Sequence, residues 1–152
     1  MEELVALLID KNISIGTCES LTGGLFASEL SSIANVSKVF KGSIVSYSNE
    51  TKVKILKVDE QLLNEVGAVS GAVARQMAEN GASILDVDCC VSFTGNAGPS
   101  SLEGKPCGLV YTAIANRGEV FVYEFQLYGS RNEIREEICF KMVEKCKEIL
   151  GL

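Results

Sequence analysis

A turn rich in hydroxyl groups and glycine is the first stretch whose residue types could carry out chemistry. The segment Thr17–Gly24 contains Ser20 and Thr22 and ends in Gly23 and Gly24, between an apolar strand-like run and a helix-like run. The first N–H groups of a helix are unpaired and its dipole favours negative charge, so such a turn can hold an anion. Two interpretations remain open. Either Thr22 only caps the helix and the glycines only permit the turn, or Ser20 or Thr22 carries out chemistry.

The chain contains no histidine, and this absence limits the chemistry open to it. It excludes a Ser–His–Asp triad, a Cys–His pair and any metal site with histidine ligands. Acid–base work must therefore fall to Lys, Asp, Glu, Tyr or Cys. The six cysteines include no Cys-x-x-Cys pair, so we expect buried, reduced thiols. Cys18, beside the glycine turn, is an alternative nucleophile, although the adjacent Glu19 disfavours a thiolate.

Composition predicts an ordinary globular chain, with 47% hydrophobic and 22% charged residues. The net charge of −6 disfavours direct binding to a nucleic-acid backbone. No apolar run approaches the roughly 20 residues of a membrane span, and the acidic start Met1–Leu4 lacks the pattern of a signal peptide. We therefore expect one cytoplasmic domain, residues 1–152, with no membrane partner.

Alternating helix-like and strand-like patterns predict an α/β fold. Helices are expected at about 1–11, 22–34, 49–56, 59–66, 71–85 and 132–150, and strands at 13–18, 42–48, 88–93, 107–116 and 119–128. Helices between the first strands favour parallel pairing, whereas the tight turn Asn116–Gly118 predicts an antiparallel closing pair. Residues 36–40 are interpreted as a loop. The expected architecture is a three-layer α/β/α sandwich with a mixed sheet of about five strands.

Three loops follow strands that should be parallel, so they should meet at one edge of the sheet. These loops are Ser20–Gly24, Ser48–Lys52 and Thr94–Lys105. They would bring together the hydroxyl of Ser20, the amine of Lys52 and, just before the second loop, the phenol of Tyr47. In a chain without histidine, a Ser–Lys pair is the remaining activated nucleophile.

Lys52 falls in the first turn of a predicted helix, an unfavourable place for a cation. The positive end of the helix dipole would lower the pKa of its amine and make it a usable base. The alternative is a solvated lysine at modest cost. At the other turn, helix-start N–H groups near Thr22–Gly24 could form an oxyanion hole or a phosphate cradle.

Six segments, in order along nearly the whole chain, resemble the CinA carboxy-terminal domain family, the PncC-type nicotinamide mononucleotide (NMN) amidohydrolases. They are Glu19–Gly24, Val45–Lys52, Gly67–Ser70, Phe93–Pro99, Lys105–Val110 and Gly129–Arg131. The resemblance implies hydrolysis of the carboxamide of NMN to nicotinate mononucleotide and ammonia, without metal or cofactor. It implies Ser20 as nucleophile, Lys52 as general base, and Tyr47 as a group that orients or relays protons.

The same resemblance implies a set of substrate-binding residues and an assembly state. The implied set is Thr22, Gly23, Gly24, Asn49, Thr94, Gly95, Gly98 and Arg131. Arg131 would hold the phosphate through a bidentate contact, and Ser37 falls where the family has a serine near the site. Homodimerisation is likewise implied.

The chain departs from the family pattern in one loop. Asn96 replaces an apolar residue, and glycines are missing after Pro99. The altered loop therefore leaves a non-catalytic nucleotide-binding or regulatory module open as an alternative. The link of the family name to competence and DNA damage leaves open a second alternative, a subunit that acts mainly in assembly. The chain resembles the stand-alone form of the family, so the pyrophosphatase activity linked to a further amino-terminal domain is not expected.

Overall fold

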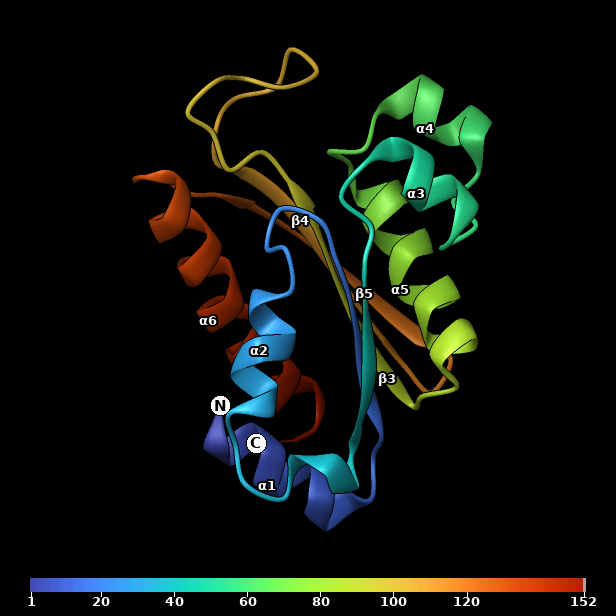
Figure 1. Cartoon of the computed structure of the whole chain (residues 1–152), viewed down its shortest axis with the longest axis vertical. Helices are drawn as coiled ribbons and strands as arrows, with labels where there is room; N and C mark the ends of the chain where they lie inside the picture. Colours follow the sequence, from blue (N-terminus) through green and yellow to red (C-terminus); the bar gives the residue numbers. More distant parts are fainter. Residues whose placement is uncertain (152) are drawn as a thin grey trace.

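A five-stranded mixed sheet lies at the centre of the computed structural model, which describes residues 1–151 (Figure 1). Leu152, the last residue of the predicted domain 1–152, lies outside the described residues. The strands are β1 Ile15–Glu19, β2 Phe40–Val45, β3 Cys89–Gly95, β4 Leu109–Asn116 and β5 Glu119–Gln126. The helices are α1 Glu2–Lys11, α2 Leu25–Ser31, α3 Asn49–Lys54, α4 Glu60–Val66, α5 Gly71–Leu85 and α6 Arg131–Ile149, with a short 3₁₀ helix, η1, at Val36–Lys38.

The strand order β2-β1-β3-β4-β5 places the first three strands side by side. β1 pairs in parallel with β2 and β3, whereas β4 is antiparallel to β3 and β5. Arg117 and Gly118 join β4 to β5 with φ angles of 48° and 89°, the left-handed pair that a two-residue hairpin turn requires. The predicted mixed sheet is confirmed, and the carboxyl ends of β1, β2 and β3 meet at one edge.

Helices cover both faces of the sheet and bury apolar residues on each. α1, α2 and α6 lie on one face, and α3, α4 and α5 lie on the other (Figure 1). On the first face, the buried residues include Leu4, Phe26 and Ile138. On the second, Met77 of α5 packs against residues of the α3–α4 region such as Leu63. The predicted three-layer sandwich is therefore confirmed.

The elements around the first turn differ from the prediction. α2 begins at Leu25, not Thr22, and its N-cap is Gly24 with φ 99°. The expected cap by Thr22 is therefore wrong. The left-handed Gly23 and Gly24 redirect the chain before the helix starts. The expected loop at 36–40 contains η1 instead.

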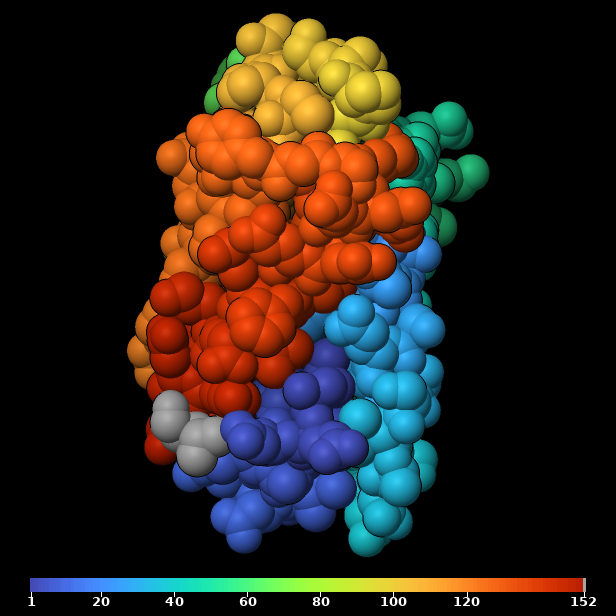
Figure 2. Space-filling model, turned by 90° about the vertical axis from the view of Figure 1, so that its left-hand side faces the viewer, coloured from blue at the N-terminus to red at the C-terminus, as the bar shows by residue number. Residues whose placement is uncertain are grey.

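β2 ends earlier than predicted. It stops at Val45, so Ser46, Tyr47 and Ser48 belong to the loop before α3. This earlier end makes room for the carbonyl groups of Ser46 and Tyr47 to face a side chain of α3. Among residues 1–151, no helix is long and apolar enough to cross a membrane. The loop between β3 and β4 stands at one end of the molecule, drawn in yellow in Figure 2.

Candidate active site

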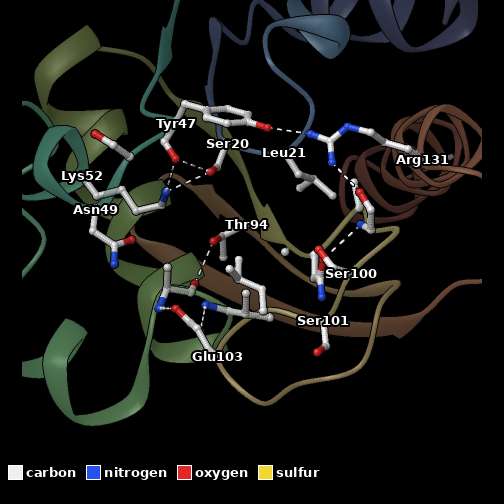
Figure 3. A pocket seen from close by; sticks show the side chains of 18 residues that line it. Ser20, Leu21, Tyr47, Asn49, Lys52, Thr94, Ser100, Ser101, Glu103 and Arg131 are labelled. Carbon is white, nitrogen blue, oxygen red and sulfur yellow. Dashed lines mark hydrogen bonds between the residues drawn. The ribbon is translucent and has the colours of Figure 1, made fainter.

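A cavity of about 470 Å³ opens at the carboxyl ends of β1, β2 and β3 (Figure 3). Eight of the predicted site residues line it: Ser20, Tyr47, Asn49, Lys52, Thr94, Gly95, Gly98 and Arg131. Thr22, Gly23 and Gly24 belong to the same turn as Ser20 but are not part of the lining, and neither is Ser37 on η1. The three loops that the topology argument expected to meet at one sheet edge all contribute residues to this cavity.

Ser20 and Lys52 form the central contact of the cavity. Nζ of Lys52 lies 2.8 Å from Oγ of Ser20 and donates to the carbonyl of Ser46 at 2.9 Å and, at 3.4 Å, to that of Tyr47. Only 2% of Lys52 and 7% of Ser20 are exposed. Backbone carbonyls therefore aim a buried amine at a buried hydroxyl.

Local structure fixes both partners. Ser20 follows β1 directly, and its amide donates to the carbonyl of Phe93 on the neighbouring strand at 3.0 Å. Ser48 caps α3, with its hydroxyl accepting from the amide of Thr51 at 3.1 Å. The amide of Lys52 then closes the first turn onto the carbonyl of Ser48. From the sequence, either Ser48 or Asn49 could cap this helix, and the structure places Ser48 at the cap.

Burial lowers the pKa of Lys52 to about 8, while the charge of Glu103 acts in the opposite direction. The lowered pKa matches the expectation, but its cause differs. The expected cause was the dipole of the helix, whereas in the structure it is loss of solvent around the amine. At a pKa of about 8, a useful fraction of Lys52 is neutral near physiological pH.

The start of α2 is already occupied by a carboxylate. Glu19 is fully buried, and its two oxygens accept from the amides of Phe26 and Ala27, each at 3.0 Å. The hydroxyl of Thr17 also donates to Glu19, at 2.9 Å. The amides of Phe26 and Ala27 are therefore already bonded and are not free to bind an anion.

A different amide is available beside Ser20. The amide of Leu21 has no acceptor within residues 1–151, and Leu21 lines the cavity. The carbonyls of Leu21 and Thr22 accept from the guanidinium of Arg135, at 3.0 and 2.9 Å, which fixes the turn from the side of α6. The buried hydroxyl of Thr22 has no partner in the described part of the chain.

Tyr47 and Arg131 meet at the mouth of the cavity. Nη2 of Arg131 donates to the phenol oxygen of Tyr47 at 2.7 Å, and Nη1 donates to the carbonyl of Gly98 at 2.6 Å. The guanidinium therefore bridges two loops. The Tyr47 side chain is 58% exposed, and its carbonyl, not its phenol, contacts Lys52. The structure thus gives no contact for the expected proton relay through the phenol.

Two of the remaining predicted binding residues, Thr94 and Gly95, shape the cavity rather than offer free polar groups. The buried hydroxyl of Thr94 donates to the carbonyl of Ala68 at 2.7 Å. A Cβ on Gly95 would lie 2.8 Å from the carbonyl oxygen of Leu109, so glycine permits the close approach of β4. Asn49 begins α3 on the wall of the cavity.

Sequence reasoning missed two carboxylates, Glu19 and Glu103. Glu103 lines the cavity and accepts from the amides of Ala68 and Val69. Its partners are backbone groups more than 30 residues away, so no spacing pattern could have indicated them. Glu19 lies in the quoted motif, but its partners are helix-start amides seven and eight residues later.

The cysteines do not contribute to the cavity lining. Cys18 is fully buried, with its Sγ 3.7 Å from Sγ of Cys90 on the side of α5. This burial removes Cys18 as an alternative nucleophile. All six thiols are free, as expected, and only Cys107 is partly exposed. Residues 1–151 contain no group of three or more His, Cys, Asp or Glu side chains placed to hold a metal ion.

Comparison with known proteins agrees with this architecture. Residues 1–150 match the sequence model of the family described as the CinA C-terminal domain. A CinA-like protein of Dictyoglomus turgidum is 48% identical over 136 residues, which cover 88% of this chain and 33% of that protein. The chain thus spans about a third of the length of the curated relatives it matches.

Solved structures show the same fold. A CinA superfamily protein of Klebsiella pneumoniae superposes with a TM-score of 0.97 at 26% identity, covering 99% of this chain and 94% of that chain. A competence/damage inducible protein of Agrobacterium tumefaciens superposes with a TM-score of 0.89 at 35% identity, covering 99% and 95%. The chain belongs to the CinA C-terminal domain family.

Proposed function

We propose that this chain is a metal-independent amidohydrolase that converts NMN to nicotinate mononucleotide and ammonia with a Ser–Lys pair. The observation that carries the proposal is the 2.8 Å contact between Ser20 Oγ and Lys52 Nζ inside a cavity. A buried amine whose pKa falls to about 8 can take a proton from a hydroxyl near neutral pH. The cavity volume of about 470 Å³ is also in the range of pockets that bind small ligands.

The geometry supports a two-step acyl transfer. Neutral Lys52 accepts the proton of Ser20 while Oγ attacks the carboxamide carbon of the substrate. Protonated Lys52 then returns that proton to the departing nitrogen as the C–N bond breaks, which leaves an acyl ester on Ser20 and releases ammonia. A water molecule, deprotonated by Lys52, attacks the ester, and the proton held by Lys52 returns to Oγ as the acid leaves.

The developing oxyanion needs a donor close to Oγ. We assign this role to the amide of Leu21, which follows the nucleophile, lines the cavity and has no acceptor within residues 1–151. Arg135 supports it by holding the carbonyl of Leu21. The positive charge of protonated Lys52, close to Oγ, would also stabilise the developing oxyanion.

Arg131 is the residue that we propose for the phosphate of NMN. Its guanidinium uses two of its five N–H groups on Tyr47 and Gly98, so donors remain for an anion at the mouth of the cavity. We further propose a cytoplasmic homodimer without direct nucleic-acid contact. The family resemblance motivates the dimer, and the net charge of −6 disfavours binding to nucleic acid.

The direct test is ammonia release from NMN by the wild type and by Ser20→Ala and Lys52→Ala. Both substitutions should lower kcat by about 10³-fold or more. Lys54→Ala is the matched control, because Lys54 is an exposed lysine on the same short helix. Turnover that survives both site substitutions would reject the assigned roles.

A nucleotide-binding module without turnover is the second candidate, and one observation favours it. Asn96 stands in the loop that departs from the family pattern, and its buried Nδ2 has no partner among the described residues. This candidate predicts calorimetric binding of NMN with no ammonia release by the wild type. Turnover of NMN would reject it.

A further inference from the structure

The loop between β3 and β4 forms one wall of the cavity. Ser100, Ser101, Leu102 and Glu103 all line it. In Figure 3, Ser101 and Glu103 lie on the side of the cavity away from Ser20 and Tyr47. The shape of the cavity therefore depends on what keeps this loop in place.

Glu103 ties the loop to the turn between α4 and α5. Its Oε2 accepts from the amide of Ala68 at 2.8 Å, and its Oε1 accepts from the amide of Val69 at 3.0 Å. Lys105, from the same loop, donates to the carbonyl of Val66 at 2.7 Å and lies 3.3 Å from Oε1 of Glu103. One carboxylate thus spans two successive amides, with a cation beside it.

The surroundings of Glu103 favour a fixed, ionised carboxylate. Partial burial alone would raise its pKa, but the amides of Val69 and Ala68 and the charge of Lys105 together hold the pKa below its usual value. Gly67 leaves the space that the carboxylate fills, because a Cβ at that position would collide with it. The Glu103 side chain is 22% exposed and that of Lys105 is 28% exposed.

The loop has few other attachments. At its start, Arg131 donates to the carbonyl of Gly98. Between residues 99 and 104, within the part of the chain that the structure describes, Glu103 makes the only hydrogen bonds to residues outside the loop. An isolated antiparallel β-bridge pairs Leu102 with Lys105 inside the loop. The wall at 100–103 is therefore held by the carboxylate of Glu103 and, at its edge, by Lys105, which donates to the carbonyls of Val66 and Val69.

We propose that Glu103 is a positioning residue, whose carboxylate ties the β3–β4 loop to the Ala68–Val69 amides and so maintains the substrate-binding wall of the cavity. The choice of NMN as substrate depends on the proposed function, whereas the hydrogen bonds from Ala68 and Val69 to Glu103 do not. Glu103 takes no part in bond making, so its loss should weaken binding. Its charge also raises the pKa of Lys52, so kcat is compared at a pH above that pKa, where Lys52 is neutral in both proteins.

Hydrogen exchange tests the tie without any substrate. In Glu103→Gln, the amides of Ala68 and Val69 lose a charged acceptor and should exchange at least about tenfold faster than in the wild type. Glu119→Gln is the matched control. Glu119 is exposed at the start of β5 and has no hydrogen-bond or ion-pair partner for its side chain within residues 1–151. If the amides of Ala68 and Val69 exchanged at the wild-type rate in Glu103→Gln, the proposal that Glu103 holds the loop to these amides would be rejected.

Steady-state kinetics tests the role in binding. At pH 9, above the Lys52 pKa of about 8, Glu103→Gln should raise KM for NMN by about fivefold or more and leave kcat within about twofold. Glu119→Gln should change neither. Gly67→Ala should reproduce the rise in KM with the charge of Glu103 retained, because its Cβ displaces the carboxylate. An unchanged KM together with faster exchange would overturn the binding role. A wild type that releases no ammonia from NMN would reject the proposed function, and hydrogen exchange would still decide the tie.

Discussion

Lys52 Nζ lies 2.8 Å from Ser20 Oγ although the two residues are 32 positions apart, one in the turn after β1 and the other in helix α3. The contact exists because β1 and β2 are parallel neighbours, so the loops that follow them leave the same edge of the sheet. Burial then removes water from the amine and lowers its pKa to about 8. The topology thus supplies the contact, and the packing supplies the basicity.

The rate of NMN hydrolysis should rise with pH until Lys52 is neutral. Because only the neutral amine accepts the proton of Ser20, kcat/KM should rise about tenfold per pH unit below the pKa of Lys52 and level off above about 8. The measurement is a pH profile of kcat/KM between pH 5.5 and 9.5. A profile that is flat across pH 7 would contradict Lys52 as the base.

The free energy of unfolding should also depend on the titration of Lys52. The pKa of Lys52 is about 8 in the folded chain and near 10.5 in the unfolded chain, so the unfolded state binds more protons between these values. The free energy of unfolding of the wild type, relative to Lys52→Met, should therefore rise with pH from about 8 to about 10.5. The full change should be at most about 3 kcal/mol.

Urea unfolding of the wild type and Lys52→Met at pH 7.5 and pH 10.5 checks this direction. All other titrating groups are common to the two proteins, so they cancel in the comparison. Lys54→Met serves as the control, because exposed Lys54 should give no pH-dependent difference. A relative stability that falls with pH would mean that the folded state favours protonated Lys52.

Much of the sheet and of the site was predictable because it depends on local pattern and topology. Helices between consecutive strands predicted parallel β1, β2 and β3, and this arrangement alone brought Ser20 and Lys52 to one edge. Residue type indicated a cap at Ser48 or Asn49, and the structure selects Ser48, whose hydroxyl bonds the amide three residues later.

Other parts of the site depend on contacts that local pattern does not encode. The acceptor for the first amides of α2 is Glu19, which lies in the strand before the turn and not next to the helix. Glu103 binds amides of a turn that precedes it by more than 30 residues. The cause of the lowered pKa of Lys52 is packing, which no single segment specifies.

Tyr47→Phe distinguishes a phenol that positions Arg131 from a phenol that relays protons. The structure places its oxygen against Arg131 at 2.7 Å, whereas Ser20 and Lys52 contact only the Tyr47 carbonyl. We therefore expect KM for NMN to rise by about threefold to tenfold, because Arg131 loses a partner at the mouth. kcat should stay within about threefold. Steady-state kinetics decides this: a fall in kcat of a hundredfold or more would assign a proton relay to the phenol.

Glu19→Gln should destabilise the fold more than any exposed Glu→Gln substitution. The buried carboxylate accepts from Phe26, Ala27 and Thr17, and a glutamine side chain offers one acceptor oxygen and turns an N–H₂ group toward the remaining donors. The expected loss is about 2–4 kcal/mol in the free energy of unfolding.

Urea unfolding at pH 7.5 measures this loss, with Glu119→Gln as the surface control. The substitution should also disturb the position of Ser20, because Glu19 binds the start of α2 and is the residue before Ser20. We therefore expect kcat for NMN to fall together with stability in Glu19→Gln. A variant as stable as the wild type would show that the α2 amides find other acceptors, and would reopen the helix start as a candidate oxyanion hole.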